Sequence, residues 1–204
     1  FLWYSWYVAR RTRQDSALLY VLERLVSRDQ EFASDNLLSE LKEIVIERDD
    51  LVKDQFHHLI EKSEVLDFDK PLSMEDFFKQ LATHMASQVA YPPTDLYRMF
   101  LQRETASSTI ITEGCAIPHI LIEGEKIFMI KLVRVRGGVI FPGDKVVRCF
   151  FVLISSLDER TAHLESLAAI AQIAQNPAFY VKWLAAGNVE DLKNIVLLAE
   201  RTRD

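Results

Sequence analysis

The chain has 204 residues, enough for one domain of ordinary size and an additional segment. Its 49% hydrophobic and 26% charged residues are typical of a globular protein and argue against extensive disorder. The formal net charge of −6 argues against a general nucleic-acid binder, because phosphate binding requires a dominant basic face; it would better suit a basic protein partner.

The first residues have the pattern of a membrane-helix end. Aromatic and aliphatic residues crowd positions 1–8, and Arg10, Arg11 and Arg13 follow directly. Aromatic belts and arginines beside an apolar segment mark the cytoplasmic end of a membrane helix, although crossing a bilayer takes about 20 residues. We therefore expect either the cytosolic tail of a longer membrane protein or an unusual amphipathic anchor. An ordinary buried N-terminal helix is the alternative.

Residues 31–70 are interpreted as a connector with some structure of its own. Leucines, isoleucine and valine at helical spacing occupy its first part, a polar helix is expected over 50–64, and a short strand over 65–68. His57 and His58 are adjacent and point apart on a helix, so we expect a solvated face and no shared metal.

Two helices precede the central part of the chain. Ser73 with Asp76 resembles a capping pair for a helix that ends before Pro92 and Pro93. Thr94 is expected to cap a second helix that runs to residue 103. Arg103 lies near the C-terminus of this helix, where the helix dipole favours a cation whether or not the residue has a functional role.

Apolar strands and helices alternate in the rest of the chain. Strands are predicted over 110–112, 127–135 and 146–154, with the last two separated by glycines and a Pro-Gly pair. Asp158 is expected to cap the next helix, and two further helices follow Asn176-Pro177 and Gly187-Asn188. This order predicts an α/β sandwich in which a mixed sheet has helices on both faces.

The segment from Arg103 to His119 combines residue types that suit anion chemistry. Pro118 restricts the backbone and therefore aims His119, whose imidazole offers a neutral nitrogen as nucleophile or ligand. A nearby Arg103 would supply a planar cation for a phosphate or carboxylate. A second histidine, His163, falls in the first turns of a helix, where free N–H groups favour an anion. The alternative is a loop histidine with a satisfied hydrogen bond.

These residues carry a family resemblance. Arg103-Glu104, Ser108-Thr109, Gly114, Ala116-Ile117-Pro118-His119, an apolar strand and then His163-Leu164 follow the order seen in type-two EIIA domains of the bacterial phosphotransferase system, the fructose, mannitol and nitrogen-regulatory kind. The resemblance covers about residues 71–200. It implies the mannitol-specific EIIA-like fold, a phosphoryl group carried by His119, and a pocket shared with His163 and Arg103. The hydroxyls of Ser108 and Thr109 are expected to bind phosphate. The chain departs from the family pattern at Ile110 to Thr112, where a glycine is usual, and at Ile120.

Residues 1–30 resemble the last membrane helix and juxtamembrane helix of amino acid-polyamine-organocation permeases. We therefore expect a membrane-helix end and juxtamembrane helix at 1–30, a connector at 31–70 and an EIIA type-2-like domain at 71–204, with a helical N-terminal extension.

The resemblance implies a regulatory domain of an amino-acid permease at the cytoplasmic face of the membrane. It would accept a phosphoryl group from an HPr-type phosphocarrier protein. The alternative is an active EIIA carrier that passes phosphate to a downstream EIIB or regulatory target, which would make it a protein-histidine phosphoryl transferase. A third interpretation is a homodimerising platform under the membrane part. No cofactor, metal or nucleic acid is expected. Cys115 and Cys149 follow no zinc or CxxC spacing.

Overall fold

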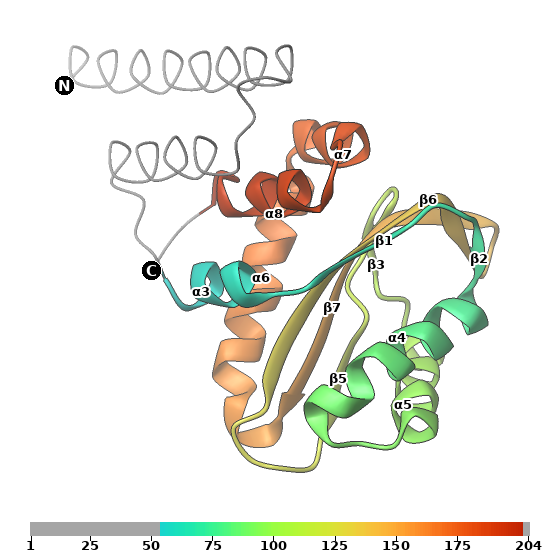
Figure 1. The fold of residues 1–204 in the computed structure, drawn as a ribbon, viewed down its shortest axis with the longest axis vertical. Coiled ribbons are helices and arrows are strands. Elements are labelled where there is room, and N and C mark those ends of the chain that lie inside the picture. Colours follow the sequence, from blue (N-terminus) through green and yellow to red (C-terminus); the bar gives the residue numbers. More distant parts are fainter. Residues whose placement is uncertain (1–53, 202–204) are drawn as a thin grey trace. The chain divides into compact units, whose positions relative to one another are not determined.

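Two long β-strands form the centre of the fold (Figure 1). The computed structural model describes residues 54–201, in which β6 (Phe128–Phe141) and β7 (Lys145–Ser156) pair antiparallel. Both contain the β-branched apolar runs that predicted strands, and both are longer than predicted. All described residues belong to one compact unit.

Shorter strands extend the sheet on either side of this pair. Two of them, β1 (Val65–Phe68) and β2 (Leu72–Ser73), run parallel to β6. On the other side β3 (Ile110–Thr112) pairs antiparallel with β4 (Cys115–Ala116), while β4 and β5 (His119–Ile122) run parallel to β7. The order is β1-β6-β7-β4-β3, with β2 also beside β6 and β5 also beside β7. The sheet is therefore mixed, as predicted.

The glycine pair expected to separate the long strands lies inside β6 instead. The register between β6 and β7 shifts between Arg134 and Val139, and Gly138 adopts a φ of +83°, as at a β-bulge. A Cβ atom at Gly137 would lie 2.3 Å from the backbone nitrogen of Pro71. Glycine is thus required where the chain entering β2 approaches β6.

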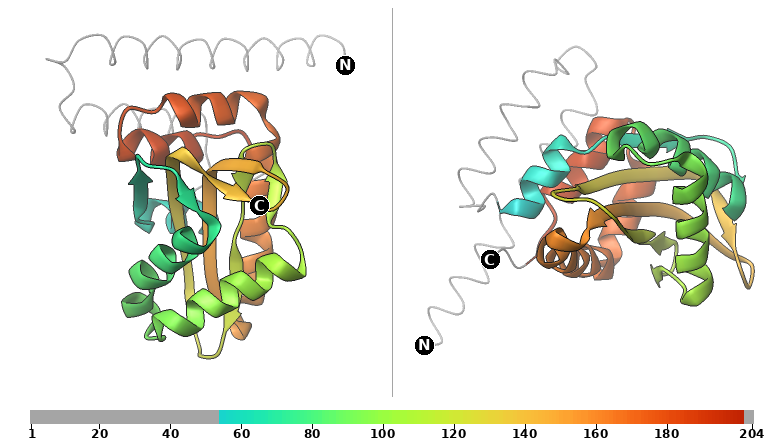
Figure 2. Two further views of the ribbon diagram at one scale, coloured as in Figure 1. Left: turned by 90° about the vertical axis from the view of Figure 1, so that its right-hand side faces the viewer. Right: turned by 90° about the horizontal axis from the view of Figure 1, so that it is seen from below.

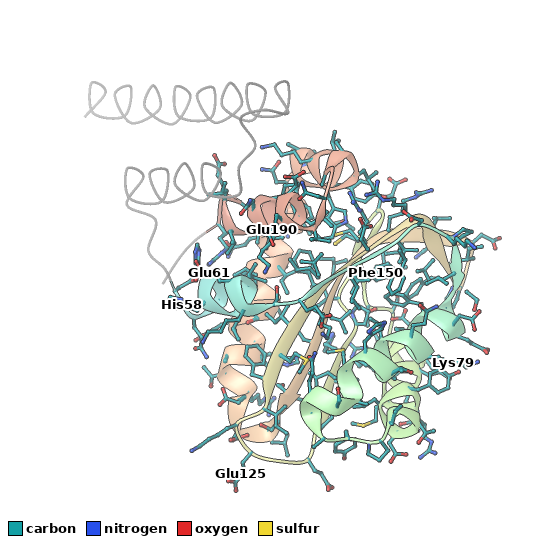
Figure 3. The ribbon with its side chains drawn as sticks, viewed as in Figure 1. His58, Glu61, Lys79, Glu125, Phe150 and Glu190 are labelled. Atoms are coloured by element: carbon teal, nitrogen blue, oxygen red, sulfur yellow. The ribbon has the colours of Figure 1, made fainter. Side chains whose placement is uncertain are left out.

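Helices cover both faces of the sheet (Figure 2). One face packs on α4 (Met74–Val89) and α5 (Pro93–Ala106). The other packs on α3 (Gln55–Lys62), α6 (Arg160–Gln175), α7 (Pro177–Ala185) and α8 (Val189–Leu197). Successive residues of β7 alternate between the two cores: Phe150, labelled in Figure 3, belongs to the first and Phe151 to the second. Burial on both faces explains the uninterrupted apolar run in the sequence.

Most helix starts agree with the sequence, and two differ. Ser73 caps α4 by accepting a hydrogen bond from the Asp76 N–H, as expected. However, α5 begins at Pro93 with Pro92 as its N-cap, so Thr94 is not the cap. Asp158 is not a helix cap either. It lies in a 3₁₀ turn, η1 (Leu157–Glu159), and accepts hydrogen bonds from the Lys126 N–H and the Ser156 hydroxyl.

The described part of the expected connector is packed into this unit. Strand β1 lies in the sheet, and α3 contacts α8 and α6. His57 is only 1% exposed and its Nε2 lies 3.3 Å from a Glu61 carboxylate oxygen, so the expectation of a solvated face was wrong for this histidine. The predictions for residues 1–53, including the membrane-helix end, lie outside the described residues. Within residues 54–201, no helix has the length and apolar character needed to cross a membrane.

Candidate functional site

The chain around Pro118 aims His119 from the start of a strand. Strands β4 and β5 both pair in parallel with β7, and Ile117 and Pro118 separate the two strands in the chain. The Ile117 N–H donates to the Thr109 carbonyl at 2.9 Å, and Pro118 accepts from the Leu153 N–H at 3.0 Å. The interruption is therefore anchored on both sides, and the half-buried His119 side chain leaves a fixed backbone.

The partners of the His119 ring define its protonation. Its Nδ1 lies 2.7 Å from the Ile117 carbonyl oxygen, which can only accept a hydrogen bond. The proton of the neutral ring is therefore assigned to Nδ1. The lone pair is on Nε2, which accepts a hydrogen bond from Nε of Arg103 at 3.2 Å.

Arg103 lies in the last turn of α5 and has two contacts. Besides Nε2 of His119, its guanidinium reaches the Ser107 carbonyl, with an Nη1–O distance of 2.8 Å. This carbonyl belongs to the C-cap residue of the helix. The sequence allowed either a role at the helix end or a role in the site, and the structure shows both contacts at once.

His163 lies beside His119 and comes from a helix. It lies in α6, is 4% exposed, and its ring centroid is 5.6 Å from that of His119, with an interplanar angle of 63°. Its Nδ1 is 2.7 Å from the Ser155 hydroxyl oxygen. Figure 1 shows β5, the start of β6 and the first turn of α6 at one end of the sheet, where Figure 3 labels Glu125 in the β5–β6 loop.

Both site histidines favour the neutral state. Burial lowers the pKa of His119; the Ile117 carbonyl opposes this shift, and the positive charge of Arg103 adds to it. Burial also lowers the pKa of His163, and the neighbouring His119 contributes in the same direction. Around neutral pH the site therefore holds two uncharged imidazoles beside one guanidinium, with a nucleophilic nitrogen on the more exposed ring.

The two expected phosphate-binding hydroxyls differ in their surroundings. Thr109 is 4% exposed, and its N–H and hydroxyl both donate to the same Glu104 carboxylate oxygen, at 2.9 and 2.5 Å. Its single hydroxyl proton is therefore already used. Ser108 is exposed and accepts a 3.4 Å hydrogen bond from the Ile110 N–H. Its own proton has no acceptor within residues 54–201 and can be donated to an anion.

Comparison with known proteins gives the family of this domain. The family model described as "Phosphoenolpyruvate-dependent sugar phosphotransferase system, EIIA 2" matches residues 58–198. The chain belongs to this EIIA type-2 family. The resemblance in the sequence is thereby confirmed for the domain, whereas the permease resemblance falls on residues outside the described part.

Relatives of the EIIA type-2 domain include nitrogen regulatory proteins. The "Nitrogen regulatory protein" of Escherichia coli (strain K12) is 28% identical over 122 residues, which cover 58% of this chain and 75% of the relative. The crystal structure of nitrogen regulatory protein IIA-Ntr from Neisseria meningitidis has a TM-score of 0.59 at 25% identity, covering 65% of this chain and 91% of the other. Mannitol IIA from E. coli has a TM-score of 0.53 at 16% identity, covering 65% and 94%, and shares the fold.

Sequence reasoning missed two supporting contacts in this EIIA type-2 domain. Glu104 is 7% exposed and holds the loop before β3 through Thr109, and Ser155 contacts His163. A signal for Ser155 existed, because two serines end the otherwise apolar run of β7. No signal indicated that Glu104 would be buried.

The remaining candidate ligands do not form a metal centre. In the part of the chain that the structure describes, no group of three or more His, Cys, Asp or Glu side chains could hold a metal ion. Cys115 and Cys149 are direct partners across β4 and β7, with sulfur atoms 3.5 Å apart. Burial raises the pKa of the Cys149 thiol, which makes it a poor nucleophile.

Proposed function

We propose that this EIIA type-2 domain is a regulatory switch in which Nε2 of His119 accepts a phosphoryl group from an HPr-type phosphocarrier protein. The observation that carries the proposal is the ring geometry of His119. One nitrogen is tied to the Ile117 carbonyl, and the other presents its lone pair to Arg103. A nucleophile needs a fixed ring and an available lone pair, and an anionic product needs a cation beside it.

The proposed reaction is a displacement at phosphorus. The Nε2 lone pair of His119 forms the new P–N bond while the bond from phosphorus to the carrier's leaving atom breaks, and the carrier keeps that electron pair. Phosphoryl transfer depends mainly on alignment and on stabilising charge on the equatorial oxygens. The Arg103 Nε–H now faces the attacking nitrogen, so it must move from Nε2 to a phosphoryl oxygen as the bond forms. Ser108 is the hydroxyl with a proton available for the same group.

A regulatory output is supported by two features. The relatives of highest identity named above are called nitrogen regulatory proteins. Residues 1–30 also carry the aromatic and arginine pattern of a juxtamembrane segment. In this proposal, phosphorylation of His119 changes the free-energy difference between two states of a transporter, to which the domain is joined at the cytoplasmic face of the membrane.

Mass spectrometry of the full 204-residue chain tests the acceptor site. Incubation with phosphorylated phosphocarrier protein is expected to add one acid-labile phosphoryl group. His119→Ala abolishes the gain, and the exposed His84→Ala, a matched histidine control, leaves it unchanged. No gain in the unmodified chain refutes the proposal.

A chase experiment separates regulation from onward transfer. The phosphorylated chain is mixed with EIIB domains from the same cell, and the phosphoryl group is followed on both proteins. Retention of the group on His119 supports a switch. Rapid movement of the group to EIIB would instead establish the phosphoryl-carrier alternative.

A further inference from the structure

Ser155 occupies a fixed place behind the site. It lies near the end of β7 and is 0% exposed, with Leu121 of β5 and Phe128 of β6 as its direct strand partners. Its neighbour in the alternation, Leu153, belongs to the core that packs on α6. The hydroxyl therefore faces α6, where it meets Nδ1 of His163 at 2.7 Å.

The protons in this contact can be counted. A neutral imidazole has one N–H and one lone pair, and a hydroxyl has one proton. If Nδ1–H donated to Ser155, the buried hydroxyl proton would have no acceptor, because His163 is the only hydrogen-bond partner of this hydroxyl within residues 54–201. If Ser155 donates to Nδ1, every group in the contact is satisfied. Leaving a buried donor unpaired is unfavourable enough to bias the equilibrium about tenfold or more.

The same accounting gives the two histidines opposite tautomers. In His119 the Ile117 carbonyl requires the proton on Nδ1 and leaves the lone pair on Nε2. In His163 the Ser155 hydroxyl requires the lone pair on Nδ1 and leaves the proton on Nε2. The ring centroids are 5.6 Å apart, so a nucleophilic nitrogen and an N–H donor belong to one site.

We propose that Ser155 is a positioning residue that holds His163 as the Nε2–H tautomer, so that this neutral ring donates a hydrogen bond to the phosphoryl group on His119. The inference rests on the proposed phosphoryl acceptor function. Ser155 itself does not reach the phosphoryl group, because it contacts the opposite nitrogen of the ring. In the other tautomer, His163 would present a lone pair to the anion and repel it.

The tautomers are measured directly, without any phosphorylation. Nitrogen-15 NMR of the ring nitrogens in the full chain is expected to find the proton on Nε2 in His163 and on Nδ1 in His119. In Ser155→Ala the two tautomers of His163 become mixed, while His119 is unchanged. Ser166→Ala is the matched control, because Ser166 is also a buried serine, at 2% exposure, and lies about one turn after His163 on α6. A proton on Nδ1 of His163 in the unmodified chain overturns the proposal whether or not any variant folds.

The consequence for transfer is measured in parallel. Ser155→Ala is expected to slow the single-turnover transfer step about tenfold without weakening carrier binding, and Ser155→Thr, which keeps the hydroxyl, restores most of the rate. Ser166→Ala stays within about twofold of the unmodified chain. Equal rates for Ser155→Ala and Ser166→Ala overturn the positioning role. If the tautomers are as expected but His119 accepts no phosphoryl group, the proposed function fails and the role of Ser155 in transfer fails with it, whereas the tautomer assignment stands.

Discussion

Replacing Arg103 by glutamine removes the one guanidinium that contacts His119 in the described structure. The Nη1 contact to the Ser107 carbonyl is exposed, so its loss changes the stability of the fold by about 0.5–1 kcal/mol. The Nε contact to His119 lies in a half-buried place and is replaced, in the phosphoryl state, by a charge-assisted hydrogen bond. Such a bond contributes about 2–3 kcal/mol, so transfer is expected to slow about 30- to 150-fold.

Two measurements on Arg103→Gln check this reasoning. Single-turnover transfer from phosphorylated carrier gives the rate, with Arg98→Gln as control, because Arg98 lies on the same helix and pairs with Asp95 in solvent. An NMR titration gives the pKa of His119, which should rise because the positive charge of Arg103 lowers it. A rate within about threefold of the control, together with an unchanged pKa, would refute the assigned role.

Three further outcomes are expected. Thr109→Val removes the hydroxyl donor to buried Glu104 and should lower the free energy of unfolding by about 1.5–3 kcal/mol in urea, whereas Thr109→Ser should recover most of it. Gly114 has a φ of +83°, and in Gly114→Ala the new Cβ atom would lie 2.4 Å from the Tyr180 ring. The free energy of unfolding, measured by thermal unfolding, should therefore fall by about 1–3 kcal/mol or more. The two site histidines have lowered pKa values in the folded state, so the unfolded chain binds protons first as the pH falls. Stability should therefore decrease as the pH falls below about 6.5, the ordinary histidine pKa, and this part of the decrease should be absent when both are replaced by glutamine.

The sequence predicted the sheet because its central strands are long, β-branched and buried on both faces. Local patterns indicated Arg103, His119 and His163 as candidates for anion chemistry, and the family resemblance implied that they share one pocket; the structure brings the three side chains together. Contacts between distant segments that the resemblance did not imply could not be predicted. Asp158 has the spacing of a helix cap, yet it accepts from Lys126, which lies in a different loop. His57 has the neighbours of a solvated helix, yet α3 packs on α8, at the far end of the chain.

The departures from the family pattern affect packing and surface more than chemistry. Ile120 follows His119 directly, but successive strand residues point to opposite faces, and its side chain lies in the core under α4 and α5 at 5% exposure. Ile111 is 38% exposed on β3, which forms an edge of the sheet. Both side chains are apolar, so neither adds a charge or a hydrogen-bonding proton to the site. Whether the domain acts as a switch or as a carrier is therefore expected to depend on the partner that docks over His119. Replacing Ile111 alone should change the affinity for this partner more than it changes the intrinsic rate of phosphoryl transfer.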